Sequence, residues 1–134
     1  MYAQQSDIED IFGVTNVAVW SQLDPTQPPG TADPNRIQSA LDYAGARIVA
    51  FFRTQGNYAT PLVPLNSAVD LVTRWAAVLA GVWLYESRGL RDDTRDGHKY
   101  STMLRRVIAE MGVYRAGNKL DAVPRWPAPT SPAA

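Results

Sequence analysis

The sequence contains no cysteine and only one histidine, His98, among its 134 residues. The lack of cysteine excludes disulfides, thiolate nucleophiles and cysteine-based zinc sites, and it is compatible with a reducing cytosol. A single histidine also excludes metal sites of the H-E-x-x-H type, which need two. We therefore expect neither a metal centre nor a cofactor.

The chain also lacks net charge and long apolar runs. Thirteen basic and thirteen acidic residues cancel, so no overall field draws the protein onto nucleic acid or an anionic membrane. The N-terminal stretch lacks the basic region and apolar run of a secretory signal, and we expect no export. The longest uncharged apolar run, residues 75–85, is about half the roughly 20 residues that span a bilayer. It predicts a core helix and no membrane association.

Catalytic motifs are missing as well. Residues 92–98 combine three aspartates with His98, but an EF-hand register starting at Asp92 places Met103 where the bidentate glutamate belongs. Ser101 lies near His98 without a G-x-S-x-G turn or an orienting acid, and no glycine-rich phosphate loop is present. The sequence predicts that the protein is not an enzyme. A small helical enzyme would instead lose an activity on mutation of His98.

The ten prolines are confined to three places: residues 25–34, residues 61–64 and the tail from 124 onward. Proline interrupts helices, so the stretches between these places are free to be helical. The pattern predicts an all-α protein with a small four-helix domain: a short N-terminal helix and three longer ones, with an extended loop and a Pro-rich C-terminal tail.

The first two predicted helices follow from capping signals. Ser6 and Glu9 have capping-box spacing, which predicts a short helix over 7–12 that Gly13 ends. A short turn over 16–22 follows. Asp33 can cap a helix that begins at Pro34 and runs to about residue 55. Its predicted buried stripe is Ile37, Ala40, Leu41, Ala44, Ile48, Phe51 and Phe52.

Residues 57–65 contain two prolines and several apolar side chains, and they predict an extended loop that docks on another surface. Asn66 or Ser67 can cap a third helix running to about Arg88. Its polar strip, Asp70, Thr73 and Arg74, gives way to Ala77, Ala80 and Gly81. A helix that is apolar all round must be enclosed, by its own domain or by a neighbouring subunit.

The fourth predicted helix runs from about 94 to 111 and is closed by Gly112. The segment from residue 122 onward is Pro-rich around Trp126 and has no means of building its own core. We divide the chain into a helical domain, residues 1–117, and a tail, residues 118–134, that is flexible or docked. The apolar stripe of the fourth helix is Tyr100, Met103, Leu104, Val107, Ile108 and Met111.

Basic residues gather around the start of the fourth helix and leave a DNA-binding regulator as an alternative. Acidic residues dilute this group, and the connection over 88–99 is too long for the tight turn of a helix-turn-helix. A regulator would bind duplex DNA in a salt-dependent way. The basic residues concerned are Arg88, Arg91, Arg95, Lys99, Arg105 and Arg106.

The order of several features over residues 1–117 resembles a family of small structural proteins of Mu-type phages, within the head-to-tail connector (adaptor or head-completion) proteins of tailed bacteriophages. The insert over 24–34 and the tail depart from the family pattern. The features that carry the resemblance are Met1, Tyr2 and Ala3 with Asp7, Ile8, Phe12 and Gly13; the helix with Ile37, Ala40, Leu41 and Ala44; the loop with Tyr58, Pro61 and Leu62; the long helix after Pro64; and the stripe from Tyr100 to Met111.

The resemblance implies a subunit of a ring, dodecameric in the virion, that attaches beneath the portal protein and docks a neck or tail protein. Packaged DNA would pass through the ring; the protein would lie in the neck of the virion and in the host cytoplasm during assembly. A stopper or another neck component is the alternative within this class. The hypothesis for the partner and oligomer interface is Tyr58, Pro61, Leu62, Val63, Leu65, Ala77, Ala80, Gly81 and Trp126.

Overall fold

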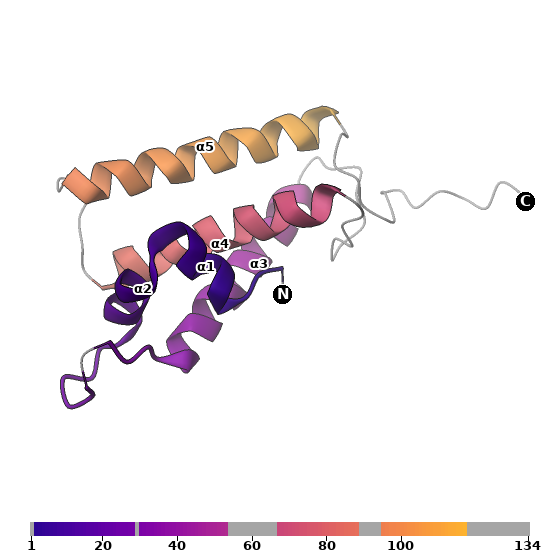
Figure 1. The fold of residues 1–134 in the computed structure, drawn as a ribbon. Helices are drawn as coiled ribbons and strands as arrows, with labels where there is room; N and C mark the ends of the chain where they lie inside the picture. The colour runs from indigo at the N-terminus through magenta and orange to yellow at the C-terminus, as the bar shows by residue number, and fades with distance from the viewer. Residues whose placement is uncertain (1, 29, 54–66, 89–94, 118–134) are drawn as a thin grey trace, which may run out of the picture.

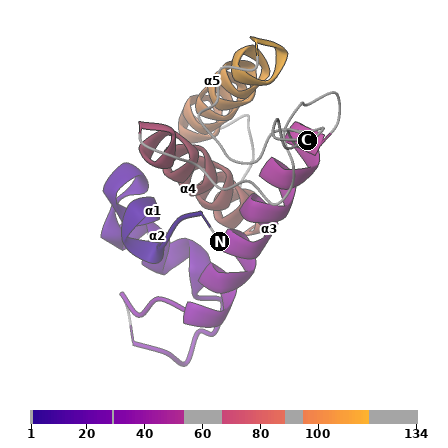
Figure 2. The same ribbon diagram turned by 90° about the vertical axis from the view of Figure 1, so that its right-hand side faces the viewer.

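The computed structural model describes residues 2–28, 30–53, 67–88 and 95–117, and the regular structure in these ranges is helical. The long helix α4 lies at the centre, with α1 and α3 on opposite sides of it and α5 along a third side (Figures 1 and 2). The prediction of an all-α fold is confirmed, although the described residues form five helices, not four. These are α1 (Gln5–Phe12), α2 (Val14–Ser21), α3 (Pro34–Arg53), α4 (Ser67–Ser87) and α5 (Arg95–Gly117).

Helix α1 begins two residues before its predicted start. Its N-cap is Gln4, whose backbone N–H donates to Asp7 Oδ2 over 2.7 Å. The predicted capping box of Ser6 and Glu9 is therefore wrong, because Asp7 takes the carboxylate position three residues after the true cap. Ile8 and Phe12 of this helix are both buried.

Gly13 separates α1 from α2, and its φ of 94° lies where residues with a side chain are rarely found. The predicted stop at this glycine is confirmed. The predicted short turn over 16–22 is a full helix, α2, that starts at Val14. The Asn16 side chain donates to the free Phe12 carbonyl over 2.8 Å, so it satisfies the end of α1 while α2 begins.

The loop between α2 and α3 is organised by short side chains. Two hydrogen bonds from Thr26 lower the pKa of the Asp24 carboxyl, and the one from the Thr26 side chain has a larger effect than the one from its backbone. At the end of the loop, Asp33 Oδ1 accepts from the backbone N–H of Asn35 over 2.9 Å and of Arg36 over 3.4 Å. Asp33 is thus the predicted N-terminal cap of α3, which begins at Pro34.

Helix α4 is enclosed by the four other helices. Every residue from Trp75 to Val82 is buried. The segment Ala68–Ser87 is long and apolar enough to cross a membrane by length and composition, and two thirds of an apolar 18-residue window in it is buried inside the protein. Burial of this kind explains its apolar surface without a bilayer, as predicted for the core helix of a folded domain.

Two groups of aromatic rings connect the helices around α4. Phe12, Trp20, Tyr85 and Tyr100 bring α1, α2, α4 and α5 together through edge-to-face contacts, with ring centroids 4.8–5.6 Å apart. Phe52 of α3 stacks on Trp75 at 5.8 Å, and Tyr114 of α5 meets the same indole edge-on at 5.6 Å. Such pairs add about 0.5–1.5 kcal/mol each beyond the burial of their area.

Helix α5 continues through Gly112 to Gly117, so the predicted closure at Gly112 is wrong. The turns beyond this glycine are held in place by packing. The Arg115 guanidinium lies 4.0 Å from the centre of the Phe51 ring and donates to the Phe51 carbonyl over 3.1 Å. A glycine lowers helix stability by about 1 kcal/mol without requiring a helix end, and these contacts of α5 with α3 extend the helix past it.

Candidate interaction surfaces

The structure separates the residues predicted for the interface. Ala77 and Ala80 have no exposed surface, and Gly81 is also buried. Of the two arrangements considered for these small residues, the structure shows close packing within the domain. The other six, Tyr58, Pro61, Leu62, Val63, Leu65 and Trp126, lie outside the described residues, as does the side chain of His98.

The close approach at Gly81 is made by Phe12. A Cβ atom added to Gly81 would overlap the Phe12 ring, whose Cζ atom would be 2.7 Å away. The ring cannot move aside easily, because its centroid lies 5.6 Å from that of Trp20 and 5.4 Å from that of Tyr100. Gly81 therefore lets α1 pack directly on α4 and brings the first aromatic group together.

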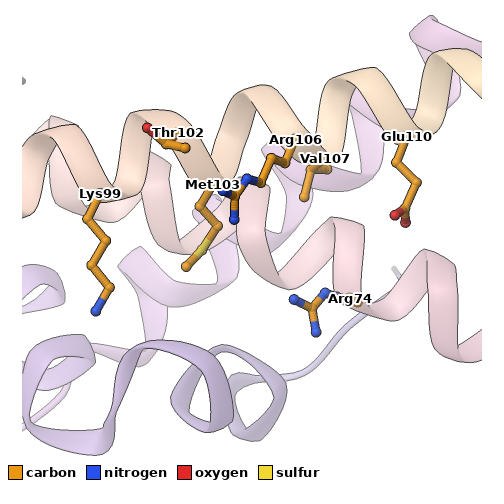
Figure 3. A pocket seen from close by; sticks show the side chains of 7 residues that line it. All are labelled: Arg74, Lys99, Thr102, Met103, Arg106, Val107 and Glu110. Carbon is orange, nitrogen blue, oxygen red and sulfur yellow. The ribbon is translucent and has the colours of Figure 1, made fainter.

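A cleft of about 580 Å³ lies between α4 and α5. Figure 3 shows side chains from α5 reaching towards Arg74 on α4. Val107 is buried and Met103 half-buried, whereas the polar residues around them are exposed. The residues that line the cleft are Arg74, Lys99, Thr102, Met103, Arg106, Val107 and Glu110.

The electrostatic character of this cleft is set by Arg74, Lys99 and Arg106. Within the described ranges, none of these three side chains forms an ion pair with a carboxylate. Glu110, the acidic residue of the lining, accepts a hydrogen bond of 2.8 Å from Trp75 Nε1. The cleft thus has an excess of positive charge above an apolar floor.

A second hollow, of about 330 Å³, adjoins the first, and Arg74 lines both. Here α1 contributes Asp7 and Asp10, and α4 contributes Asp70. The side of α4 between α1 and α5 is therefore divided into an acidic part next to α1 and a basic part next to α5. The zero net charge of the chain gives no indication of this separation of acidic and basic groups on the surface.

A third surface feature lies where α3 meets α4. The Arg36 guanidinium lies 5.4 Å from the centre of the Trp83 ring and donates to Ser87 Oγ over 2.6 Å. The Tyr43 ring is 6.1 Å from the Trp83 ring, and its hydroxyl accepts from Arg47 over 2.7 Å. Arginine, tryptophan and tyrosine are enriched at protein–protein interfaces. Here Arg36 and Tyr43 contact Trp83, although the buried Nε atom of Arg36 has no hydrogen-bond partner among the described residues.

Other exposed apolar side chains are dispersed over four helices and the loop after α2. Scattered exposure of this kind is common on folded proteins and does not define a binding surface. The residues are Val14, Val19, Leu23, Tyr43, Val69 and Val113. Among the described residues, no group of three or more histidine, aspartate or glutamate side chains is placed to hold a metal ion.

Sequence reasoning did not identify the cleft between α4 and α5. The signal was present, because Lys99, Thr102, Met103, Arg106 and Glu110 recur at intervals of three and four and so share one face of a helix. The apolar stripe of this helix and the basic cluster around its start each contain only part of this signal. Their overlap on one side of α5 is what produces a charged rim around an apolar floor.

Comparison with known families places these features in context. The family described as Bacteriophage Mu, Gp36 matches residues 2–113. The chain belongs to this family. The match to the Gp36 family includes Phe12, Gly81 and every residue that lines the cleft between α4 and α5. No curated protein and no solved structure matches the chain.

Proposed function

We propose that this phage protein is a structural component of the virion: a head-to-tail connector (adaptor) subunit, one of a ring that attaches beneath the portal and docks the neck or tail. The observation that carries the proposal is the match to the Gp36 family, which extends over α1–α4 and most of α5. The order of the N-terminal, loop and helix motifs, which resembles that of phage connector proteins, also supports it.

The surface of the folded domain is compatible with such an assembly. Acidic groups gather beside α1 and basic groups beside α5. A subunit of a neck ring also contacts proteins other than its own copies, and surfaces of opposite charge can select different partners. The enclosed core of α4 would give each subunit a fixed shape on which these surfaces are displayed.

Deletion of the gene tests the proposed role. We expect DNA-filled heads and complete tails to accumulate without joining, because packaging precedes attachment of the connector in this proposal. Mass spectrometry of purified wild-type particles should detect the protein, and electron microscopy should locate it beneath the portal. Expression of the wild-type gene from a plasmid is the control and should restore joined particles.

Two outcomes would contradict the proposal. Absence of the protein from purified particles would remove a structural role in the virion. Normal joining of heads and tails in the deletion strain would remove the connector role. If the protein is found at the far end of the neck and not against the portal, the stopper alternative replaces the adaptor.

A further inference from the structure

We infer that the cleft between α4 and α5 binds a short acidic segment of a different protein, with an apolar side chain of that segment placed against Met103 and Val107. This binding site goes beyond the connector role and does not depend on it. The inference rests on three properties of the cleft: its shape, its uncompensated positive charge and the position of the nearby acidic hollow.

The cleft has the anatomy of an interface. Its floor is formed by Met103 and by Val107, which is 7% exposed, and its rim consists of exposed charged and polar side chains. Protein interfaces combine a buried apolar centre with a polar rim in this way. From Lys99 to Glu110 the cleft follows α5 for about 16 Å at 1.5 Å per residue, the length of about five residues of extended peptide.

The charge of the cleft specifies an acidic partner. Arg74 comes from α4, whereas Lys99 and Arg106 come from α5, and all three line the cleft (Figure 3). None of them forms an ion pair with a carboxylate of the described residues, and Glu110 is the one acidic side chain among the lining residues given above. Carboxylates entering the cleft would form charge-assisted hydrogen bonds with these groups, and the guanidinium of Arg106 or Arg74 can bind one in bidentate fashion.

The same surroundings disfavour nucleic acid. A DNA duplex presents continuous rows of phosphates, and its grooves accept protruding helices or strands, not a hollow. Phosphates extending from the basic cleft along α4 would reach Asp7, Asp10 and Asp70 in the adjoining hollow. Repulsion from these carboxylates confines the attractive region to the short stretch beside α5.

A second copy of the chain is also a poor occupant. The carboxylates of Asp7 and Asp10 on α1 line the hollow beside the cleft, so they are set back next to the cleft of their own subunit. Asp24 is bound to Thr26, and Asp42 accepts from Gln38 over 2.9 Å. Asp7 and Asp10 thus lie beside the cleft of their own subunit, and Asp24 and Asp42 are held by hydrogen bonds, which favours a different protein as the occupant.

Two neighbouring arginines on α5 provide a matched test. Arg105 and Arg106 are both exposed, but only Arg106 lines the cleft. The probe is a fluorescein-labelled peptide of glutamate and leucine, with a lysine and leucine peptide as the control for charge, and binding is followed by fluorescence anisotropy of the full chain at low salt. We expect Arg106→Glu to weaken binding of the acidic peptide by about tenfold or more, and Arg105→Glu to change it less than about twofold.

Any of the following results would overturn the inference: no binding of the acidic peptide to the wild-type chain, equal weakening by the two substitutions, or tighter binding of duplex DNA than of the peptide with the same dependence on Arg106. Light scattering tests the remaining occupant, because a wild-type dimer that Arg106→Glu converts to a monomer would assign the cleft to a second copy. Far-UV circular dichroism should be the same for both variants, and Arg74→Glu, on the opposite side of the cleft, should reproduce the loss.

Discussion

Helices α4 and α5 have nearly equal lengths, 21 and 23 residues, yet they are buried to very different extents. Along α4, burial is continuous from Trp75 to Val82, and all four other helices contact it. Along the described side chains of α5, only Tyr100, Val107 and Met111 are buried. The middle of α4 is a core element on every side, whereas α5 is a core element along a narrow stripe.

Because of this difference in burial, residues that determine the stability of the domain and residues that can contact a partner lie largely on different helices. Substitutions in the enclosed part of α4, from Trp75 to Val82, act on several helix contacts at once, because every residue in this part is buried or half-buried. Substitutions on the outer surface of α5 leave the core intact and change what the protein presents to a partner. We therefore expect mutations in the buried part of α4 to be detected as unfolding, and those on the rim of the cleft as altered binding.

The largest effect should come from Trp75→Ala. The indole has no exposed surface, stacks on Phe52 of α3, meets Tyr114 of α5 and donates to Glu110. Removing it leaves a cavity between three helices, and we expect a loss of about 3–5 kcal/mol in the free energy of unfolding. Chemical denaturation followed by circular dichroism measures this loss.

Trp83→Ala is the control for this prediction, because it removes the same side chain from the same helix at a half-buried position. The expected loss is smaller, below about 2 kcal/mol, since the space it leaves is open to solvent. Similar losses for the two tryptophans would show that enclosure by α3 and α5 is not what makes Trp75 important.

The second effect compares the glycines of the two helices. A methyl group at Gly81 would overlap the Phe12 ring, whereas one at Gly112 would lie 4.0 Å from Phe51 Cζ, an ordinary contact. We expect Gly81→Ala to destabilise the protein by about 2 kcal/mol or more through overpacking. Gly112→Ala should stabilise it by about 0.5–1 kcal/mol, because alanine favours the helix over glycine. Thermal and denaturant unfolding of the pair measures both signs.

A double variant identifies the cause at Gly81. Phe12→Leu removes the ring that a Cβ atom would meet, so Gly81→Ala should cost less in that background than in the wild type. The two losses would then be less than additive, as expected for residues in direct contact. Strict additivity would show that the Phe12 ring does not limit the space at Gly81.

Much of this fold could be predicted from the sequence, because its signals are local. Proline placement, the cap at Asp33, the stop at Gly13 and the apolar stripes require only the chemistry of neighbouring residues. The errors are also local ones decided by packing: Asp7 in place of Glu9 at the first cap, a full helix α2, and continuation of α5 through Gly112. In each case a tertiary contact or a competing side chain outweighed the propensity.

The surfaces were harder to predict, because they depend on which helices lie side by side. The sequence indicated that the apolar half of α4 must be covered, but not that Phe12 would cover Gly81. It showed a basic cluster near Lys99 and Arg106, but not that Arg74, some 30 residues earlier in the chain, would join it. Contacts between distant segments carry no signal in a single sequence.

The smallest expected effect is the difference in stability loss between the same substitution, valine to alanine, on α4 and on α5. Val78 of α4 has no exposed surface, whereas Val107 of α5 is 7% exposed and forms part of the cleft floor. Val78→Ala should leave a closed cavity and cost about 2 kcal/mol, while Val107→Ala should cost about 1 kcal/mol because it only deepens an existing cleft. The free energies of unfolding of the two variants measure the difference. Equal losses would mean that α5 is packed as tightly as α4 at these positions. The apolar floor of the cleft would then be rigid, and the proposed acidic segment would have less freedom to place an apolar side chain against it.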